Sequence, residues 1–260
     1  MRPVSTLDPA GIKGLFFDID DTLTTEGRLT AQAYAALERW KSAGKIAVPV
    51  TGRPAGWCDH IARMWPVDAV VGENGAFYFR YDPALRKLRQ RFLYEHPIRA
   101  ANRARLAAVR DLILAQVPGC AVASDQPYRQ ADLAIDFCED VPPLPLSEAE
   151  RIATLMRQNG MTARISSIHV NGWFGVYDKL GMTKILAREC WGLDLDAARA
   201  QFCFAGDSPN DSPMFGYFPS SVGVANVRRF ADTIEARPAF VTLQESGAGF
   251  TELVSRLLGD

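Results

Sequence analysis

The sequence has almost no excess of charge of either sign, since 29 Lys and Arg residues balance 30 Asp and Glu residues over 260 positions. That balance argues against a partner bound through charge along the whole chain, so neither nucleic acid nor an anionic membrane is expected. The apolar runs reach strand length only, well short of the roughly 20 residues that cross a bilayer. The N-terminus also lacks the basic and apolar stretches of a signal peptide, so a cytoplasmic protein is expected.

Cysteine is sparse as well, and the chain contains no Cys-x-x-Cys pair. The five cysteines are scattered at Cys58, Cys120, Cys138, Cys190 and Cys203. An odd number without a pairing pattern favours reduced thiols that fill core space over a disulfide framework. Internal repeats and low-complexity tracts are also absent. A chain of this length therefore builds one large domain, or a domain plus a second, smaller one.

Both ends of the chain alternate strand-like apolar runs with helical patterns. Residues 14–18 and 46–50 are continuous apolar runs, which are typical of buried parallel strands. Between them, residues 30–43 repeat apolar positions at helical spacing. Further elements are predicted as a helix over residues 55–64 and strands over residues 69–71, 201–206, 222–224 and 240–243. This alternation predicts an α/β fold with a doubly wound, Rossmann-like parallel sheet covered on both faces.

The middle of the chain has a different pattern. Residues 76–80 and 88–92 predict an antiparallel pair of strands. The other expected elements are a helix over residues 98–116, a strand over 133–137, a helix over 147–158 that opens with a capping box of Ser147 and Glu150, and a strand over 162–170. These elements predict an α+β cap inserted at residues 82–172, which leaves residues 1–81 and 173–260 for the core.

Four short segments carry polar residues suited to one chemistry, and three of them follow a predicted strand. In the first, Asp18-Ile19-Asp20-Asp21-Thr22, the side chains of Asp18 and Asp20 project into one crevice at the carboxyl edge of the sheet. Like charges this close are costly unless a cation or an electrophile shares the site. Because the preceding strand is apolar and buried, a site explains this segment better than an acidic surface turn does.

The second and third segments could hold a phosphate group. Thr51-Gly52-Arg53 offers a hydroxyl, a flexible glycine and a guanidinium after a buried strand. Lys179 lies near the start of a predicted helix, where its charge adds to the positive field of the helix N-terminus. Alone, the Thr51-Gly52-Arg53 segment would also fit an ordinary turn, and Lys179 would also fit a solvated surface lysine.

The fourth segment is Gly206-Asp207-Ser208-Pro209-Asn210-Asp211, in which two carboxylates flank an amide after a buried strand. A helix is predicted to begin at Pro209, since proline suits a first helical turn. Hard oxygen ligands of this kind favour Mg²⁺ over zinc or copper. A helix cap would explain Asp207 alone, but it explains the whole group poorly.

In this order, the four segments resemble the motifs of the haloacid dehalogenase superfamily, and the combination of residues 18–22 with residues 206–211 is highly specific. The Gly72-Glu73-Asn74-Gly75-Ala76 segment and the insertion resemble the type IIB branch, which carries an α/β cap at this place and often acts on phosphorylated sugars. The resemblance implies a Mg²⁺-dependent phosphatase whose partner is a small phosphorylated metabolite, with a sugar phosphate as the expected substrate. Whether the chain is a monomer or a homodimer stays open.

The resemblance also implies a role for each motif residue. Asp18 attacks phosphorus and forms an aspartyl-phosphate, while Asp20 protonates the leaving oxygen and then activates water. Thr51 and Lys179 hold the phosphoryl oxygens, and Asn210 orients Lys179 or the nucleophile. Mg²⁺ is assigned to four acidic residues, namely Asp18, Asp20 through its backbone carbonyl, Asp207, and Asp211 either as a ligand or as a carboxylate behind the ligands.

Further substrate contacts are expected from side chains that could face the crevice. The candidates are Gly52, Arg53, Asn74, His169, Asn171 and Asn210. Trp173 either contacts a sugar ring or packs in the hinge between core and cap, and the sequence leaves both interpretations open.

Two other functions fit the same residues. A sugar phosphomutase of this fold would also need Asp18 and Asp20, although phosphomannomutase-like proteins usually carry glycine where this chain has Asp21. A non-catalytic regulatory protein that binds a sugar phosphate would have no need of a nucleophile. Release of inorganic phosphate without a bisphosphate activator would favour the hydrolase over both.

Overall fold

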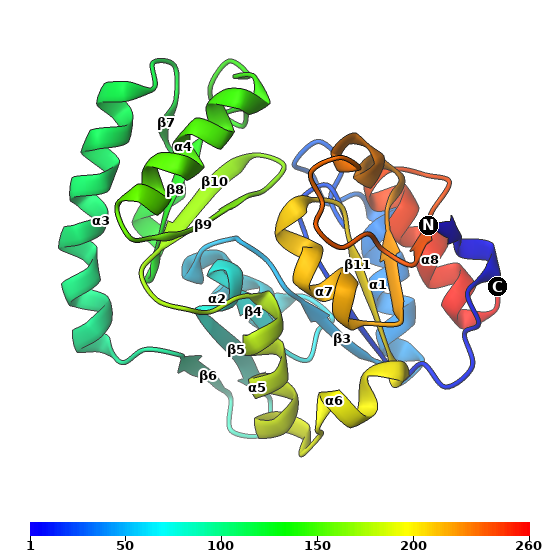
Figure 1. The fold of residues 1–260 in the computed structure, drawn as a ribbon. Helices are drawn as coiled ribbons and strands as arrows, with labels where there is room; N and C mark the ends of the chain where they lie inside the picture. The colour runs from blue at the N-terminus through cyan, green and yellow to red at the C-terminus, as the bar shows by residue number, and fades with distance from the viewer.

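Six parallel strands form the central sheet, in the order β1-β13-β12-β11-β2-β3 (Figure 1). In this computed structural model, which describes all 260 residues, they are β1 (Arg2–Pro3), β2 (Gly14–Phe17), β3 (Ile46–Pro49), β11 (Phe202–Gly206), β12 (Ser220–Gly223) and β13 (Phe240–Val241). Every residue of β2 and β11 is buried, because these strands lie inside the sheet and are covered on both faces. The parallel sheet predicted from the apolar runs is confirmed.

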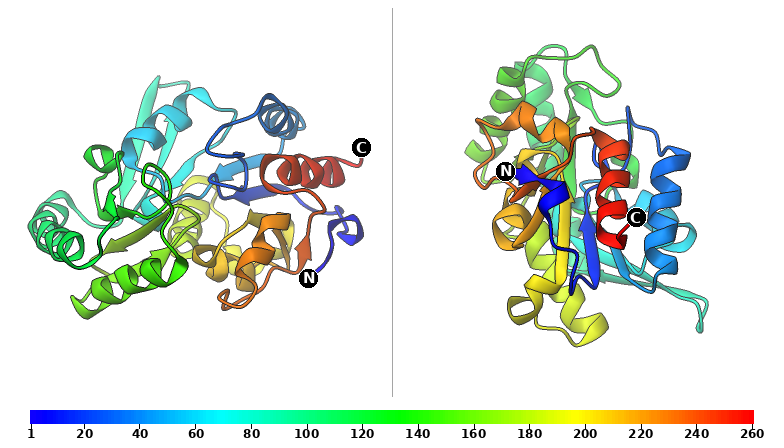
Figure 2. Two further views of the ribbon diagram at one scale, coloured as in Figure 1. Left: turned by 90° about the horizontal axis from the view of Figure 1, so that it is seen from above. Right: turned by 90° about the vertical axis from the view of Figure 1, so that its right-hand side faces the viewer.

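Helices cover both faces of this sheet. They are α1 (Ala31–Ser42) and α8 (Ser246–Leu258) on one face, and α5 (Lys179–Trp191), α6 (Leu195–Ala198) and α7 (Ser212–Tyr217) on the other (Figure 2). Leu15 and Phe17 of β2 pack in an apolar cluster with α1 and α8, whereas Phe16 packs in the cluster that contains α5 and α7. The doubly wound arrangement is therefore confirmed. None of the helices has both the length and the apolar character needed to cross a membrane.

Three antiparallel strands lie beside β3, in the order β4-β5-β6. They are β4 (Val70–Gly72), β5 (Phe77–Asp82) and β6 (Lys87–Phe92), and α2 (Ala55–Met64) packs on them. The pair predicted from residues 76–80 and 88–92 is confirmed. β4 is the strand predicted at residues 69–71, but it meets the parallel sheet only through a bridge between Val50 and Val71.

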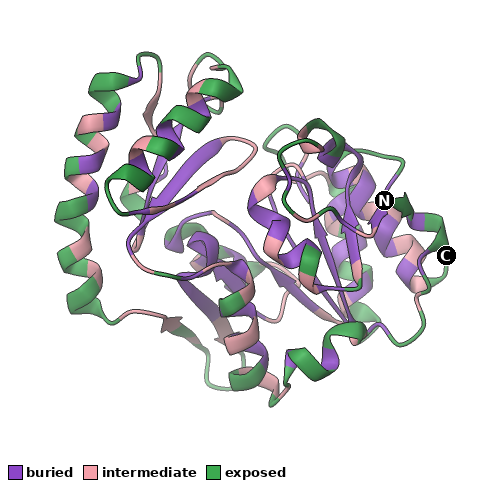
Figure 3. Cartoon of the chain, in the orientation of Figure 1, coloured by how far each residue is buried: buried purple, intermediate pink, exposed green.

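The cap is a four-stranded antiparallel sheet, in the order β7-β8-β10-β9, with two helices on the face away from the core (Figure 1). Its elements are α3 (His96–Gln116), β7 (Ala121–Val122), β8 (Asp132–Asp136), α4 (Leu146–Gln158), β9 (Thr162–Ile165) and β10 (His169–Trp173). Apolar side chains of α3 and α4 pack on the sheet, and the outward faces of both helices are exposed (Figure 3). An α/β core with an inserted cap is thus confirmed. The boundaries at residues 82 and 173 stay a prediction, since the β5–β6 hairpin crosses the first and β10 ends at the second.

The single strand predicted over residues 162–170 is wrong. A turn divides it into β9 and β10, which pair with each other in antiparallel fashion. Ser166 makes this turn, because its backbone N–H donates to His169 O at 2.9 Å and its Oγ accepts from His169 N at 3.0 Å.

The capping box predicted at Ser147 and Glu150 is also wrong. The helix begins one residue earlier, at Leu146, and Pro145 occupies the N-cap position without a side-chain hydrogen bond. Ser147 therefore lies inside the first helical turn and is not at the N-cap position from which its side chain could cap the helix.

Candidate active site

The carboxyl edge of the parallel sheet gathers the acidic residues. Asp18 follows β2, and Asp207 follows the neighbouring strand β11, so both stand at the same edge. Asp211 ends the short 3₁₀ turn Pro209–Asp211 just beyond. One carboxylate oxygen of each lies within 4.8 Å of the others, and all three residues are buried. The structure thus brings these carboxylates within reach of a single ion.

Lys179 is the cation of this cluster. It is the first residue of α5, and only 1% of it is exposed. Its Nζ lies 3.0 Å from Asp18 Oδ2 and 2.8 Å from Asp211 Oδ1. Burial disfavours the charged amine, but the two carboxylates outweigh burial and raise the pKa of Lys179 above its ordinary value. Lys179 therefore stays protonated and bridges two of the three acids.

Three buried carboxylates facing one amine leave the cluster with too much negative charge. Burial raises the pKa of Asp18 to about 7, although Lys179 opposes this rise. Burial, with Asp211 and Asp18 nearby, raises the pKa of Asp207 well above its ordinary value. Such shifts mark a site that lacks positive charge. The buried oxygen donors therefore fit a Mg²⁺ ion, whose charge would balance them.

Hydrogen bonds fix the two carboxylates that follow β11. Asp207 accepts from Thr22 Oγ1 at 3.1 Å and from Asn226 Nδ2 at 3.4 Å. Asp211 Oδ2 accepts from the backbone N–H of Asp207 at 3.0 Å. A Cβ at Gly206 would lie 2.4 Å from that same oxygen, so only glycine fits there. Sequence reasoning missed Asn226, which lies in no recognised motif.

The Thr51 segment follows β3, and its guanidinium is already engaged. Thr51 is buried, and its Oγ1 accepts from Arg53 N at 3.0 Å. A Cβ at Gly52 would lie 3.2 Å from Asn74 Nδ2, so the glycine lets these side chains approach. Arg53 Nη2 donates to Asp20 Oδ1 at 2.8 Å, and Arg53 Nε lies 3.0 Å from both Asp20 oxygens. Arg53, predicted as a substrate contact, therefore holds Asp20 in this structure.

Asn210 makes no hydrogen bond with Lys179 or with Asp18, which contradicts the orienting contact predicted for it. Its Oδ1 accepts from Ser208 Oγ at 2.8 Å, and this bond turns its Nδ2 toward Asn74 Oδ1 at 3.4 Å. Asn74 Nδ2 is buried and has no partner. Because an unpaired buried N–H is costly, this amide is suited to donate to a phosphoryl or substrate oxygen.

The predicted cap residues all lie on β10, at or near the seam with the core. His169 Nε2 lies 2.8 Å from Glu139 Oε2. Asn171 Nδ2 donates to Asp132 Oδ2 at 3.0 Å, and Asn171 Oδ1 faces Gly52. Trp173 is buried in the apolar cluster beneath β5, which matches the packing alternative.

Cap residues that sequence reasoning missed tie the cap to the core. Arg129 is buried, donates to Gly52 O at 2.8 Å and pairs with Asp125 at 2.9 Å. Glu139 Oε1 lies 2.6 Å from Arg53 Nη2. No motif marks Arg129 or Glu139, since their core partners Gly52 and Arg53 lie on a distant segment of the chain. The cap therefore contacts the Thr51 segment through the hydrogen bond from Arg129 to Gly52 O and through the Arg53–Glu139 ion pair.

Gly75 lies where the Glu73–Gly75 turn meets the start of α5. Its φ is 106°, and a Cβ there would lie 2.0 Å from Asp178 O. We expect Gly75→Ala to displace the helix start that carries Lys179 and to lower the free energy of unfolding by at least about 3 kcal/mol. Urea denaturation measures this loss. Gly44→Ala, with φ 74° and no atom within 4 Å, is the matched control and should cost about 1 kcal/mol. Equal losses would contradict the steric account.

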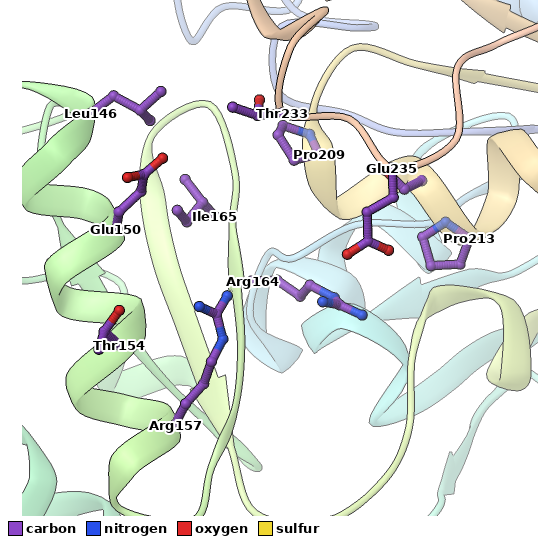
Figure 4. A pocket seen from close by; sticks show the side chains of 11 residues that line it. Leu146, Glu150, Thr154, Arg157, Arg164, Ile165, Pro209, Pro213, Thr233 and Glu235 are labelled. Atoms are coloured by element: carbon purple, nitrogen blue, oxygen red, sulfur yellow. The ribbon is translucent and has the colours of Figure 1, made fainter.

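Two cavities lie along the seam between core and cap. The first, here called the mouth, has a volume of about 230 Å³, and its charged lining is Asp20, Asp21, Glu26, Arg53 and Glu139. The second, of about 310 Å³, lies between α4 and β9 of the cap and the segment around Pro209 and Glu235 (Figure 4). Arg157 and Arg164 line its cap side, but neither Asp18 nor Lys179 does. Of these two cavities, the mouth is the one that adjoins the predicted acid–base residue Asp20.

The chain is similar to known proteins in part of its sequence and in its whole fold. Residues 15–103 match the family model of haloacid dehalogenase-like hydrolases. No curated protein matches the chain in sequence. A HAD/COF-like hydrolase from Plasmodium vivax shares 16% identity at TM-score 0.68, over 96% of each chain.

Two further solved structures share the fold. The sucrose-phosphatase from Synechocystis sp. PCC6803, solved with sucrose and phosphate, shares 14% identity at TM-score 0.62, over 94% of this chain and 97% of that one. A structure described as a HAD subclass IIB sugar phosphatase shares 15% identity at TM-score 0.60, over 95% of this chain and 99% of that one. At these identities the likeness concerns the fold, cap included.

Proposed function

We propose that this chain, whose residues 15–103 match the family model of haloacid dehalogenase-like hydrolases, is a Mg²⁺-dependent phosphatase that hydrolyses a small phosphomonoester, with a sugar phosphate as its substrate. The observation that carries the proposal is the bridge from Lys179 Nζ to Asp18 and Asp211, at 3.0 and 2.8 Å, beside the third buried carboxylate of Asp207. A purely structural cluster would gain nothing from burying three acids around one amine, because unpaired buried charge is costly.

Asp18 is the proposed nucleophile. Its Oδ1 accepts from the backbone N–H of Ile19 at 2.8 Å and its Oδ2 faces Lys179, so the carboxylate is held from both sides. In the first step an Asp18 oxygen bonds to phosphorus while the bond to the leaving oxygen breaks. Lys179, Thr51 and Asn74 would hold the phosphoryl oxygens. Bound Mg²⁺, held by Asp18, Asp20 O, Asp207 and Asp211, would neutralise charge on phosphate and carboxylates.

Asp20 is the proposed acid and base. It gives its proton to the leaving oxygen and then takes one from the water that attacks phosphorus, which frees Asp18 and releases inorganic phosphate. Arg53 donates a hydrogen bond to the Asp20 carboxylate, and Glu139 of the cap forms an ion pair with Arg53. The position of the acid is thereby coupled to the position of the cap.

Phosphate release tests the proposal. The panel comprises sugar phosphates, phosphoglycolate, nucleotides and pyridoxal phosphate, each with Mg²⁺ and without a bisphosphate activator. Inorganic phosphate released from at least one compound by the native chain, and not by Asp18→Asn, would support the hydrolase. No release from any compound would contradict it.

The metal-free protein is expected to lose stability as pH rises from about 5 to about 8. Burial raises the pKa of Asp18 to about 7 and, together with Asp132, raises the pKa of Glu73 to about 8. In the unfolded chain both carboxyls ionise near pH 4. Within this window the folded chain holds protons that the unfolded chain has lost, so rising pH favours unfolding. Thermal unfolding across the window measures the effect.

Mg²⁺ and one variant serve as controls for this pH dependence. Mg²⁺ should flatten the part of the decline that comes from Asp18, and so stabilise the protein more at about pH 8 than at about pH 5. Asp18→Asn, without metal, should also decline less steeply. A metal-free stability that rises steadily across the window would contradict the account.

A further inference from the structure

A third cavity, here called the groove, opens on the core beside Asp20. It has a volume of about 340 Å³, and its apolar lining is Ile19, Leu29, Trp57, Ile61 and Trp65. These residues come from the start of the chain and from α2 and the residues just after it. None of them belongs to the four motifs except Ile19, which separates the two aspartates.

The groove lies next to the mouth. Asp20, Thr24 and Gly27 line both cavities. In the proposed reaction Asp20 gives its proton to the leaving oxygen, so the group attached to that oxygen must lie beside Asp20. The leaving group therefore has two neighbouring spaces, the charged mouth and the apolar groove.

Trp57 is the most exposed aromatic side chain of the groove. It is 42% exposed, and the guanidinium of Arg53 lies 4.4 Å from the centre of its ring. The same guanidinium holds Asp20 at 2.8 Å. Arg53 thus contacts both the Asp20 carboxylate and the Trp57 ring, and it holds the two side chains close to each other.

The groove offers few hydrogen bonds to a polar ligand. The Thr24 hydroxyl already donates to Ile19 O at 3.1 Å and accepts from Asp21 N at 3.2 Å. The Asp20 carboxylate already accepts hydrogen bonds from Arg53. The remaining polar groups of the lining side chains are the imidazole of His60 and the indole N–H groups of Trp57 and Trp65. A polyol placed here would leave hydroxyls unpaired, whereas an apolar ring would lose only its contact with water.

We propose that this groove binds an aromatic or other apolar ring carried by the substrate's leaving group, with Trp57 as the contact that selects it. The inference rests on the proposed phosphatase activity and narrows its sugar phosphate substrate to a phosphorylated glycoside bearing such a ring. Trp57 is then a specificity residue that does not touch the reacting atoms.

The test compares benzyl phosphate with ethyl phosphate, whose alcohols have similar acidity and differ in that a phenyl ring replaces a methyl group. Native protein with Mg²⁺ should show a kcat/KM for benzyl phosphate that is roughly tenfold higher or more, as burial of a ring predicts. The gain should appear mainly in KM. Trp57→Ala should lower the ratio of kcat/KM for benzyl phosphate to kcat/KM for ethyl phosphate at least about threefold. Met64→Ala, on the same helix but outside the lining, should leave the ratio unchanged.

The possible outcomes separate this inference from the proposed function. Equal kcat/KM for the two esters in the native chain, or an unchanged ratio in Trp57→Ala, would contradict the proposed role of the groove but not the proposed phosphatase activity. Failure to release phosphate from either ester or from any panel compound would overturn both. The inhibition constants of benzylphosphonate and ethylphosphonate compare binding of the same two groups without turnover. A variant with little activity therefore still shows whether Trp57 favours the ring.

Discussion

Asp18→Asn is expected to lower kcat by at least about 10³, because the amide cannot form the bond to phosphorus that the carboxylate forms. The fold should survive the change. Asp18 is buried with a pKa raised to about 7, so removing its charge relieves repulsion within the acidic cluster. Steady-state phosphate release, with the native chain and the variant at equal folded concentration, measures the effect.

Asp21→Asn is the matched control for the nucleophile. Asp21 lies three residues away, and its positive φ of 54° is one that asparagine also adopts readily. We expect this control to change kcat by less than about tenfold. A variant at position 18 that kept a tenth of the native turnover would contradict the nucleophile assignment, as would a control that lost as much activity as Asp18→Asn.

Removal of divalent ions is expected to abolish phosphate release, and excess Mg²⁺ should restore it. Lys179 alone cannot balance Asp18, Asp207 and Asp211, so a dianionic phosphate would be repelled from the metal-free site. Dialysis against EDTA followed by activity measurement and Mg²⁺ titration tests this expectation.

Two controls sharpen the metal experiment. EDTA already loaded with Mg²⁺ should leave activity intact, which separates chelation from direct binding of EDTA. Asp207→Asn should raise the Mg²⁺ concentration needed for half activity, since it removes one charged ligand. Turnover that persists after complete chelation would remove the metal from the mechanism.

The sequence predicted the sheet edge well because the signals there are local. Asp18, Thr51 and Asp207 each follow a buried apolar run, and parallel strands bring such positions to one edge. Lys179 was predicted from its place at the start of a helix, and its two carboxylate partners lie at that edge.

The closure of the cap could not be predicted, because it depends on contacts between distant segments. Arg53 and Glu139 are separated by 86 residues, and Arg129 reaches Gly52 across 77. Nothing in the local pattern distinguishes such side chains from solvated ones. The engagement of Arg53 with Asp20 was missed for the same reason, and Arg53 was predicted to contact substrate.

The hairpin turn at Ser166 shows a different limit. Residues 162–170 contain no Gly or Pro to mark a break, so their apolar pattern indicated one strand. The serine hydroxyl makes the turn by accepting from the backbone N–H of His169. Serine also occurs within strands, so its presence alone does not predict a turn.

The binding of a divalent ion at the sheet edge can be measured directly with Mn²⁺ in place of Mg²⁺. Crystals grown with Mn²⁺ should show one anomalous peak per chain between the carboxylates of Asp18, Asp207 and Asp211, with the Lys179 amine close by. A peak at another position, or none at saturating Mn²⁺ with these side chains placed as here, would contradict the site and the chemistry built on it.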